Sequence, residues 1–339
     1  MATTKSGTVG DSAGTATTAV PVGSSPRAQR VAILLLILGN LLWAGTYVTG
    51  KIALEQLSPI ELNSLRFTLA GLLLSPVVIR GWRQIPRDRN SLLLLGQIVL
   101  MGWVLNKALE YIGLGLSTAS DVALLIATES LFTAVLSWLF LRERITSVSI
   151  VALAVGLSGA YLIVERGLMP SLGGGSSGDS LRIIGDLLVI GSLVLEAAYT
   201  IRGKTALSRL SLPPLLLTSA TLAGSMLVWV PAGAIAVWQA GVPSLSLAGW
   251  LSVLYMAIGS SVLGYWLWFH GLGILDASAA APTLFVQPLV GAALGILLLH
   301  DPVSWATILG GGLIGLSLLL VIMGPRRRPP PVLVEDFTP

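Results

Sequence analysis

The sequence contains no cysteine and only two histidines, His270 and His300. Without cysteine the chain can form no disulfide and can use no thiolate as a nucleophile. The two histidines do not fall in a His/Glu metal-binding motif. These absences argue against thiol chemistry and metal-assisted hydrolysis, and no metal or other cofactor is expected.

Charge is also scarce, because only 11% of the residues are charged and 54% are hydrophobic. A soluble domain carries about 25% charged residues, so this chain cannot cover a water-facing surface. The sequence predicts an integral protein of the cell membrane, in contact with the lipid bilayer. The net charge of +4 is therefore no sign of a nucleic-acid partner, and the basic residues are better sorted by membrane side.

Long apolar runs follow one another along the chain, each close to the 20 residues that a helix needs to cross a bilayer. They predict an all-α membrane protein with ten transmembrane helices, at 31–53, 60–80, 91–112, 119–141, 147–165, 183–203, 213–238, 248–270, 277–299 and 303–323. The segment 1–30, rich in Thr, Ser, Ala and Gly, is expected to be a disordered tail. The segment 166–182 is expected to be a Gly/Ser-rich linker, and 324–339 a basic, Pro-rich tail.

The two halves, 31–165 and 183–323, repeat one pattern. Leu114-Gly115 matches Leu272-Gly273 and Glu143 matches Asp301 at a shift of 158 residues, while Gly50-Lys51 matches Gly203-Lys204 at a shift of 153. Five spans per copy is an odd number, so the second copy enters the membrane from the opposite side. The sequence thus predicts two inverted five-helix repeats, an arrangement typical of carriers that work by alternating access around a central site.

The basic residues give an orientation for these ten spans. With both termini cytoplasmic, fifteen of the twenty Lys and Arg residues fall in cytoplasmic segments. Only three fall in extracellular segments, Lys51, Arg166 and Arg182, and the remaining two, Arg66 and Lys107, lie within spans. The positive-inside rule favours this arrangement.

Several short motifs recur in a family order: Trp43-Ala44-Gly45-Thr46-Tyr47, Ser58-Pro59, Leu65-Arg66-Phe67 and Arg142-Glu143-Arg144. With these motifs the chain resembles the EamA-type branch of the drug/metabolite transporter superfamily over 31–323. The resemblance implies a ten-helix carrier that moves small metabolites such as amino acids, often outward. The chain departs from the family pattern at Glu129-Ser130, where a proline is common, and at the exit His300-Asp301-Pro302.

Ionisable residues inside the predicted spans are costly in a bilayer and so mark candidate functional positions. Lys107 and Glu110 share a helical face, either as a self-neutralising pair or as cavity lining. Glu129 is a lone acid in the fourth span; Arg66 or Lys107 could be its partner, or it could carry a proton. A substrate amine and a proton could then compete for this carboxylate. Arg66 itself is expected to tie two helices together or to reach toward the membrane surface.

Aromatic and amide side chains add stacking area and a few oriented hydrogen bonds, which suit an amphiphilic solute. Asn40, Trp43 and Tyr47 form one stripe of the first span, and Glu196 lies near Tyr199 in the sixth. The candidate substrate-binding residues are Asn40, Trp43, Tyr47, Lys107, Glu110, Tyr111, Glu129, Glu196, Tyr199, Tyr265, Trp268 and Gln287. Four further tryptophans are expected in the interfacial belt: Trp82, Trp238, Trp250 and Trp305.

Together these features predict a transporter of a small amino-acid-like or amphiphilic solute, and the family resemblance implies that it works as an exporter. Two alternatives remain open: a channel-like facilitator of the same fold, and an intramembrane enzyme, for which no catalytic set is evident. The GxxxG spacings at Gly291/Gly295 and Gly311/Gly315 would allow either internal helix packing or a homodimer.

Overall fold

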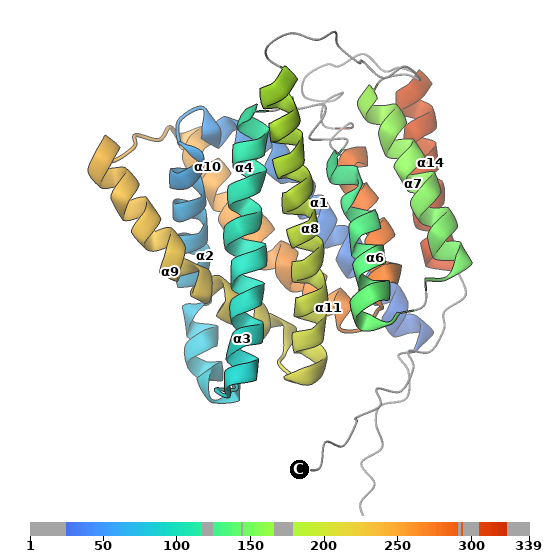
Figure 1. Ribbon diagram of the computed structural model, residues 1–339, viewed down its shortest axis with the longest axis horizontal. Helices are drawn as coiled ribbons and strands as arrows, with labels where there is room; N and C mark the ends of the chain where they lie inside the picture. Colours follow the sequence, from blue (N-terminus) through green and yellow to red (C-terminus); the bar gives the residue numbers. More distant parts are fainter. Residues whose placement is uncertain are drawn as a thin grey trace, which may run out of the picture.

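The computed structural model describes residues 25–116, 125–143, 145–165, 179–290, 293 and 305–323. Every regular element in these ranges is helical, and the helices stand side by side in one bundle (Figure 1). Six of them are long and apolar enough to cross a membrane: Pro26–Leu54, Pro59–Gln84, Arg89–Gly113, Ile183–Arg209, Pro214–Ala240 and Leu247–Leu272. Four shorter apolar helices cover Leu125–Leu141, Ser147–Leu162, Ala277–Val290 and Ile308–Met323.

Each of these ten helices overlaps one of the ten spans predicted from the sequence. In the first copy the elements are α1 (Pro26–Leu54), α2 (Pro59–Gly81), η1 (Trp82–Gln84), α3 (Arg89–Ile98), η2 (Val99–Leu105), α4 (Asn106–Leu116), α6 (Glu129–Leu141) and α7 (Ser147–Glu165). In the second they are α8 (Asp179–Arg209), α9 (Pro214–Ala240), α10 (Leu247–Leu254), η3 (Tyr255–Gly264), α11 (Tyr265–Leu272), α12 (Ala277–Ala280), η4 (Ala281–Phe285) and α14 (Trp305–Met323). The first residues of the predicted fourth span, 119–124, and most of 291–299 lie outside the described residues, as do the predicted tails through 24 and from 324 and most of the predicted linker.

The sequence sets the helix starts through side-chain caps. Ser58 and Glu61 form a capping box at the start of α2, with Ser58 N donating to Glu61 Oε2 at 2.7 Å and Pro59 in the first turn. Asp88 accepts from Ser91 N at 2.9 Å at the start of α3. These caps satisfy backbone N–H groups that have no partner inside the helix, so each span begins at a fixed residue.

The two copies pack so that helices at matching positions meet. α2 lies along α9, and α7 lies along α14 at the right of Figure 1. α1 packs against η3 and α11, and in the same way α8 packs against α3, η2 and α4. The principal core therefore lies between the copies, where it joins Phe67, Trp103, Tyr199, Trp229 and Trp268.

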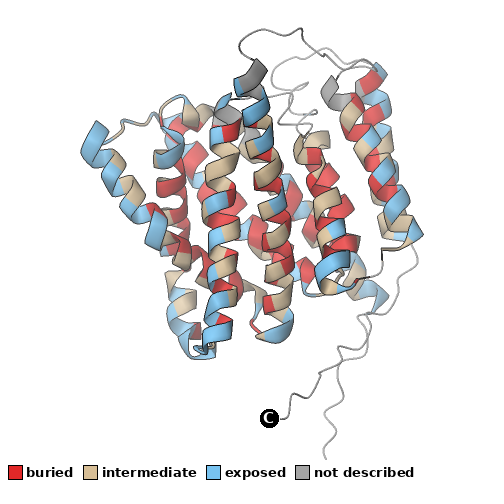
Figure 2. Cartoon of the chain, in the orientation of Figure 1, coloured by how far each residue is buried: buried red, intermediate tan, exposed pale blue. Residues whose placement is uncertain are grey.

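The outer surface of the bundle is apolar. Leu227 is 82% exposed and Ile79 is 73% exposed, and Figure 2 shows exposed residues along the outward faces of helices whose inner faces are buried. Such a surface suits lipid rather than water. The four tryptophans expected in the interfacial belt are all exposed: Trp82, Trp238, Trp250 and Trp305.

Both third helices contain a π-helical segment, which the sequence analysis did not predict. η2 and η3 occupy matching positions, because 99–105 shifted by 158 gives 257–263. In each segment one carbonyl accepts an indole N–H: Trp229 Nε1 donates to Trp103 O at 2.8 Å and Trp43 Nε1 to Ser260 O at 3.2 Å. The wider π turn thus fixes a tryptophan from another helix in each case.

Both fourth helices are irregular at matching positions. Thr128 N donates to Leu125 O at 2.8 Å, a tight turn from which α6 begins at Glu129. In the second copy the 3₁₀ segment η4, which contains Pro282, precedes Val286 and Gln287. Glu129 and Gln287, which match at the shift of 158, thus each follow an irregular turn.

The glycine spacings do not decide the homodimer prediction. Gly291 and Gly295 lie outside the described residues. A Cβ at Gly311 would contact Leu289, and one at Gly315 would meet no heavy atom within 4 Å among the described residues. The close approach of α7 to α14 instead involves Gly159, whose added Cβ would lie 2.6 Å from Gly310 O.

A charged cluster joins the two copies at the end of α6, where Glu143 and Asp276 lie outside the membrane-spanning helices. Lys204 Nζ lies 3.0 Å from Glu143 Oε1 and 3.5 Å from Asp276 Oδ1. Glu143 also accepts from Ala277 N at 3.2 Å and Ser278 N at 3.0 Å. Burial alone would raise the pKa of Glu143, but Lys204 and these backbone donors outweigh it, so the pKa lies below its ordinary value. At Asp276 burial dominates and raises the pKa.

We expect Glu143→Gln to lower the free energy of unfolding by about 2 kcal/mol at neutral pH, because it removes charge-assisted hydrogen bonds in a buried setting. The lowered pKa means that the contribution of Glu143 is present above its unfolded pKa and is lost as pH falls through its folded pKa. Thermal unfolding of the purified protein from pH 7 to about pH 3 measures both. The difference between wild type and variant should shrink toward acid pH.

Glu55→Gln is the matched control, because Glu55 is exposed. It should leave the unfolding temperature unchanged at every pH. A Glu143→Gln protein as stable as wild type at neutral pH would contradict the assigned role of the cluster.

Candidate functional site

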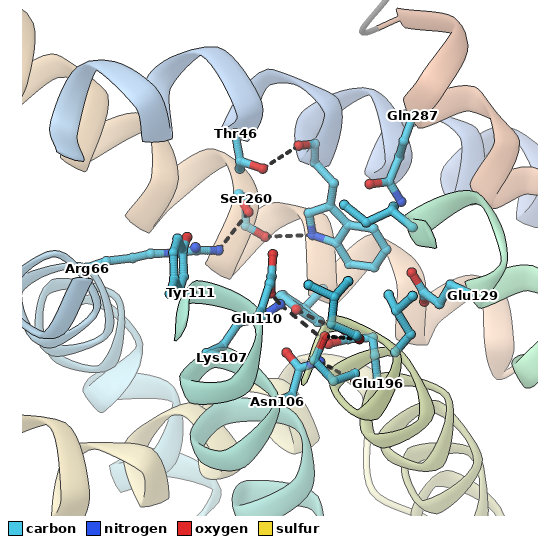
Figure 3. A pocket seen from close by; sticks show the side chains of 16 residues that line it. Thr46, Arg66, Asn106, Lys107, Glu110, Tyr111, Glu129, Glu196, Ser260 and Gln287 are labelled. Carbon is cyan, nitrogen blue, oxygen red and sulfur yellow. Dashed lines mark hydrogen bonds and ion pairs between the residues drawn. The ribbon is translucent and has the colours of Figure 1, made fainter. Parts of the chain in front are cut away.

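A cavity lies between the two copies, at the level of Lys107 and Glu129 (Figure 3). Its volume is about 70 Å³, and both copies supply its walls. It is lined by Trp43, Thr46, Arg66, Asn106, Lys107, Glu110, Tyr111, Ile126, Glu129, Val189, Ser192, Leu193, Glu196, Ser260, Tyr265 and Gln287. Eight of the twelve residues predicted from the sequence are in this lining: Trp43, Lys107, Glu110, Tyr111, Glu129, Glu196, Tyr265 and Gln287.

Lys107 is the cation of an ionic wall. Its Nζ lies 2.8 Å from Glu110 Oε2 and 3.4 Å from Glu196 Oε2, the second contact being an ion pair without hydrogen-bond geometry. Tyr265 OH donates to Glu196 Oε1 at 3.3 Å. The predicted pairing of Lys107 with Glu110 is present, but Lys107 also contacts Glu196. One ammonium therefore serves two carboxylates from different copies.

Trp43 forms an aromatic wall beside this cluster. Its ring centroid lies 4.8 Å from that of Tyr265 and 5.4 Å from that of Trp268. Its indole N–H is used by Ser260 O, so the ring is held in one orientation. A flat apolar surface and a group of charges therefore share one cavity.

The ionic and aromatic walls occupy matching positions of the two copies. Glu196 matches Trp43 at the shift of 153, and Lys107 matches Tyr265 at the shift of 158. The contact of Lys107 with Glu196 is thus the counterpart of the contact of Tyr265 with Trp43. One contact between the copies is ionic and the other is aromatic, so the two sides of the cavity differ in chemistry.

Glu129 lines the cavity and is buried, with 8% exposure. Among the described residues no ion pair or hydrogen bond reaches its carboxylate, so neither predicted partner, Arg66 or Lys107, pairs with it directly. The reason is that Lys107 is held by Glu110 and Glu196 and Arg66 by Ser260 and Ser261. Gln287, its counterpart, donates to Asn40 Oδ1 at 3.0 Å.

Three predicted residues do not line the cavity. Asn40 is buried and donates to Leu36 O at 2.8 Å, and it holds Gln287 in place. Tyr199 and Trp268 belong to the buried aromatic core beneath the cavity. The side chain of Tyr47 lies outside the described residues.

The sequence analysis missed Arg66 and Asn106 as cavity-lining residues. Arg66 does tie α2 to η3, as expected, and also faces the cavity. Asn106 donates to Ser192 O at 2.7 Å, and its Oδ1 has no partner among the described residues. Asn106 directly precedes Lys107, but the π segment η2 changes the direction in which the side chains of this turn point. The sequence contains no signal that predicts this segment. No three carboxylates or histidines of the described ranges could hold one metal ion.

Comparison with known proteins identifies the fold and the family. The model of the EamA-like transporter family matches residues 30–165 and again 183–323. An uncharacterized transporter of Archaeoglobus fulgidus is 30% identical over 297 residues, which cover 87% of this chain and 99% of that protein. The uncharacterized inner membrane transporter YedA of Escherichia coli K12 is 27% identical, over 85% of this chain and 90% of its own length. A crystal structure at 18% identity and a TM-score of 0.68, covering 85% of this chain and 95% of the other, has the same fold.

Two family matches, one per half, cover most of the sequence, and the apolar helices and relatives agree with them. The chain therefore belongs to the EamA-like transporter family and is an integral membrane transporter.

Proposed function

We propose that this transporter moves a small amino-acid-like or amphiphilic solute out of the cell by alternating access, through the cavity between two inverted five-helix repeats. The observation that carries the proposal is Glu129, a buried carboxylate in the cavity without a cation in contact among the described residues. An ionised group costs about 2.5–3.5 kcal/mol at the centre of a membrane helix on insertion scales. A substrate amine or a proton would offset that cost.

The site also limits the size of the solute. A cavity of about 70 Å³ is much smaller than the several hundred Å³ of a pocket for a drug-sized ligand. Trp43 and Tyr265 offer a ring surface next to the charges. These features favour a small solute with one apolar part and one cationic part.

Alternating access by rocking requires two halves that move against each other across an interface. Several features of the molecule support this mechanism. Matching helices of the two copies pack on one another, and the fourth helix of each copy is interrupted beside the cavity. Helices interrupted near the substrate are common in carriers built from inverted repeats. The cluster of Glu143, Lys204 and Asp276 bridges the copies at one end of the bundle, so it is a contact that such a motion would have to break.

The orientation is the first test. We expect both termini in the cytoplasm, because fifteen basic residues fall on that side and three on the other. Reporter domains fused after Thr338 and inserted near Ser176 should report opposite sides of the membrane. Readouts from the same side would contradict the scheme of five spans per repeat.

Glu129→Gln is the second test, because it keeps the volume and removes the charge. We expect uptake into reconstituted vesicles, measured over a panel of amino acids and amines, to fall by about tenfold or more, the value of one charge-assisted contact. Lys107, Glu110 and Glu196 face Glu129, the ammonium opposing its protonation and the two carboxylates favouring it. If Glu129 exchanges a proton during transport, removing its carboxylate should also flatten the pH dependence of transport.

The exposed acid Glu55 supplies the control, since Glu55→Gln should transport like wild type. Expression level and unfolding temperature separate lost transport from lost folding. A well-folded Glu129→Gln protein with normal rates and an unchanged pH profile would exclude the role given to Glu129. Passive equilibration of a solute, with no accumulation against a gradient, would instead favour the channel-like facilitator.

A further inference from the structure

Arg66 is a buried cation without an anion in contact among the described residues. It is 4% exposed and lines the cavity from α2. Nε donates to Ser261 Oγ at 2.7 Å and Nη2 to Ser260 Oγ at 2.9 Å, and the guanidinium lies 5.0 Å from the centroid of the Phe67 ring. No carboxylate of the described residues lies within ion-pair distance of it, although Lys107 in the same cavity has two.

The hydroxyls around Arg66 do not satisfy its guanidinium. The group has five N–H donors arranged as a planar fork. The two serines engage two of them and the Tyr111 side chain makes a further hydrogen bond to Arg66, so donors remain without a partner among the described residues. A guanidinium remains charged in any protein setting, so it cannot reduce the cost of burial by losing a proton. Its fork matches a carboxylate or phosphate in a bidentate manner. The wall of the cavity thus holds a fixed positive charge and guanidinium N–H groups that have no hydrogen-bond partner among the described residues.

The surroundings of Arg66 are suited to an anionic group. Ser260 also lines the cavity, and Tyr111 lies beside Arg66 (Figure 3). Glu129 lies on the opposite side of the cavity in that view. Lys107 contacts two carboxylates, Glu110 and Glu196. Among the described residues, Arg66 and Glu129 are the cavity charges without an oppositely charged group in contact, and they lie at opposite sides of the same space.

We infer that Arg66, with Ser260, forms an anion subsite that takes a carboxylate or a group of similar shape and charge on the transported solute. The inference rests on the proposed function and deepens it: Glu129 receives the cationic end and Arg66 the anionic end, so the solute is a zwitterion bound in one orientation. A role limited to joining α2 to η3 would need only the serine hydrogen bonds and would leave no preference for an anion.

Matched probes separate these two roles in the purified protein. 4-Methylpentanoate and 4-methylpentanamide share one shape and differ in charge, and L-leucinamide carries an amine without a carboxylate. Thermal unfolding is followed as each probe is titrated. We expect 4-methylpentanoate to stabilise the wild type at lower concentration than the amide does, and Arg66→Gln to weaken the apparent affinity for the carboxylate by about 10- to 100-fold. The response to L-leucinamide should remain.

Two variants guard against simple loss of folding. Ser261→Ala removes one hydrogen bond to Arg66 but keeps its charge, so it should lower stability while retaining the preference for the carboxylate over the amide. Arg66→Lys keeps a point charge without the fork and should retain part of that preference. Glu129→Gln should show the reverse pattern, losing the response to L-leucinamide and keeping the response to 4-methylpentanoate.

Three outcomes would overturn the anion subsite: equal binding of acid and amide by the wild type, no response to the acid, or an undiminished preference in Arg66→Gln. Ser261→Ala losing the preference to the same extent as Arg66→Gln would also assign Arg66 a purely structural role. These readouts need no transport, so an absence of solute accumulation in vesicles would count against the carrier and not against the subsite.

Discussion

The cost of holding an ionised side chain away from water constrains the whole cavity. Lys107 meets this cost with carboxylates from both copies, Glu110 at 2.8 Å and Glu196 at 3.4 Å. Because Glu196 is on α8 and Lys107 on α4, the ion pair also fixes how one copy sits on the other. Breaking a buried pair by removing one partner costs more than the pair contributes, so the packing of α4 on α8 and the charge balance of the cavity depend on each other.

Duplication accounts for the fold, and divergence between the copies accounts for the site. The positions that hold Lys107 and Glu196 in one contact hold Tyr265 and Trp43 in the other. Likewise Glu129 corresponds to Gln287, which is held by Asn40. A fully symmetric cavity would present the same groups to a solute from either side. Here the exchange of charges for rings at matching positions makes the two sides different, which is what a solute with unlike ends requires.

The sequence predicted most of this architecture because its signals were strong and local. Apolar runs of about 20 residues gave the ten helices, and the repeat at shifts of 153 and 158 brought Glu129 and Gln287 into correspondence. What could not be predicted depends on contacts between distant residues. The π segments η2 and η3 have no local sequence signature, yet they aim Asn106 and provide the carbonyl that holds Trp43. The position of Arg66 at the cavity follows from its packing against Ser260 and Ser261, nearly 200 residues away.

A carrier that binds a charged solute needs cavity groups that are not already paired within the protein. If every charge in the cavity were paired within the protein, a charged solute would have to break an ion pair to bind, and little net affinity would remain. Lys107 is such a paired group, which suits it to hold the wall. Arg66 and Glu129 instead meet only hydroxyls or no polar partner among the described residues. These charges without a counter-ion in contact destabilise the empty cavity. A zwitterionic solute can pair with both of them without breaking an existing ion pair.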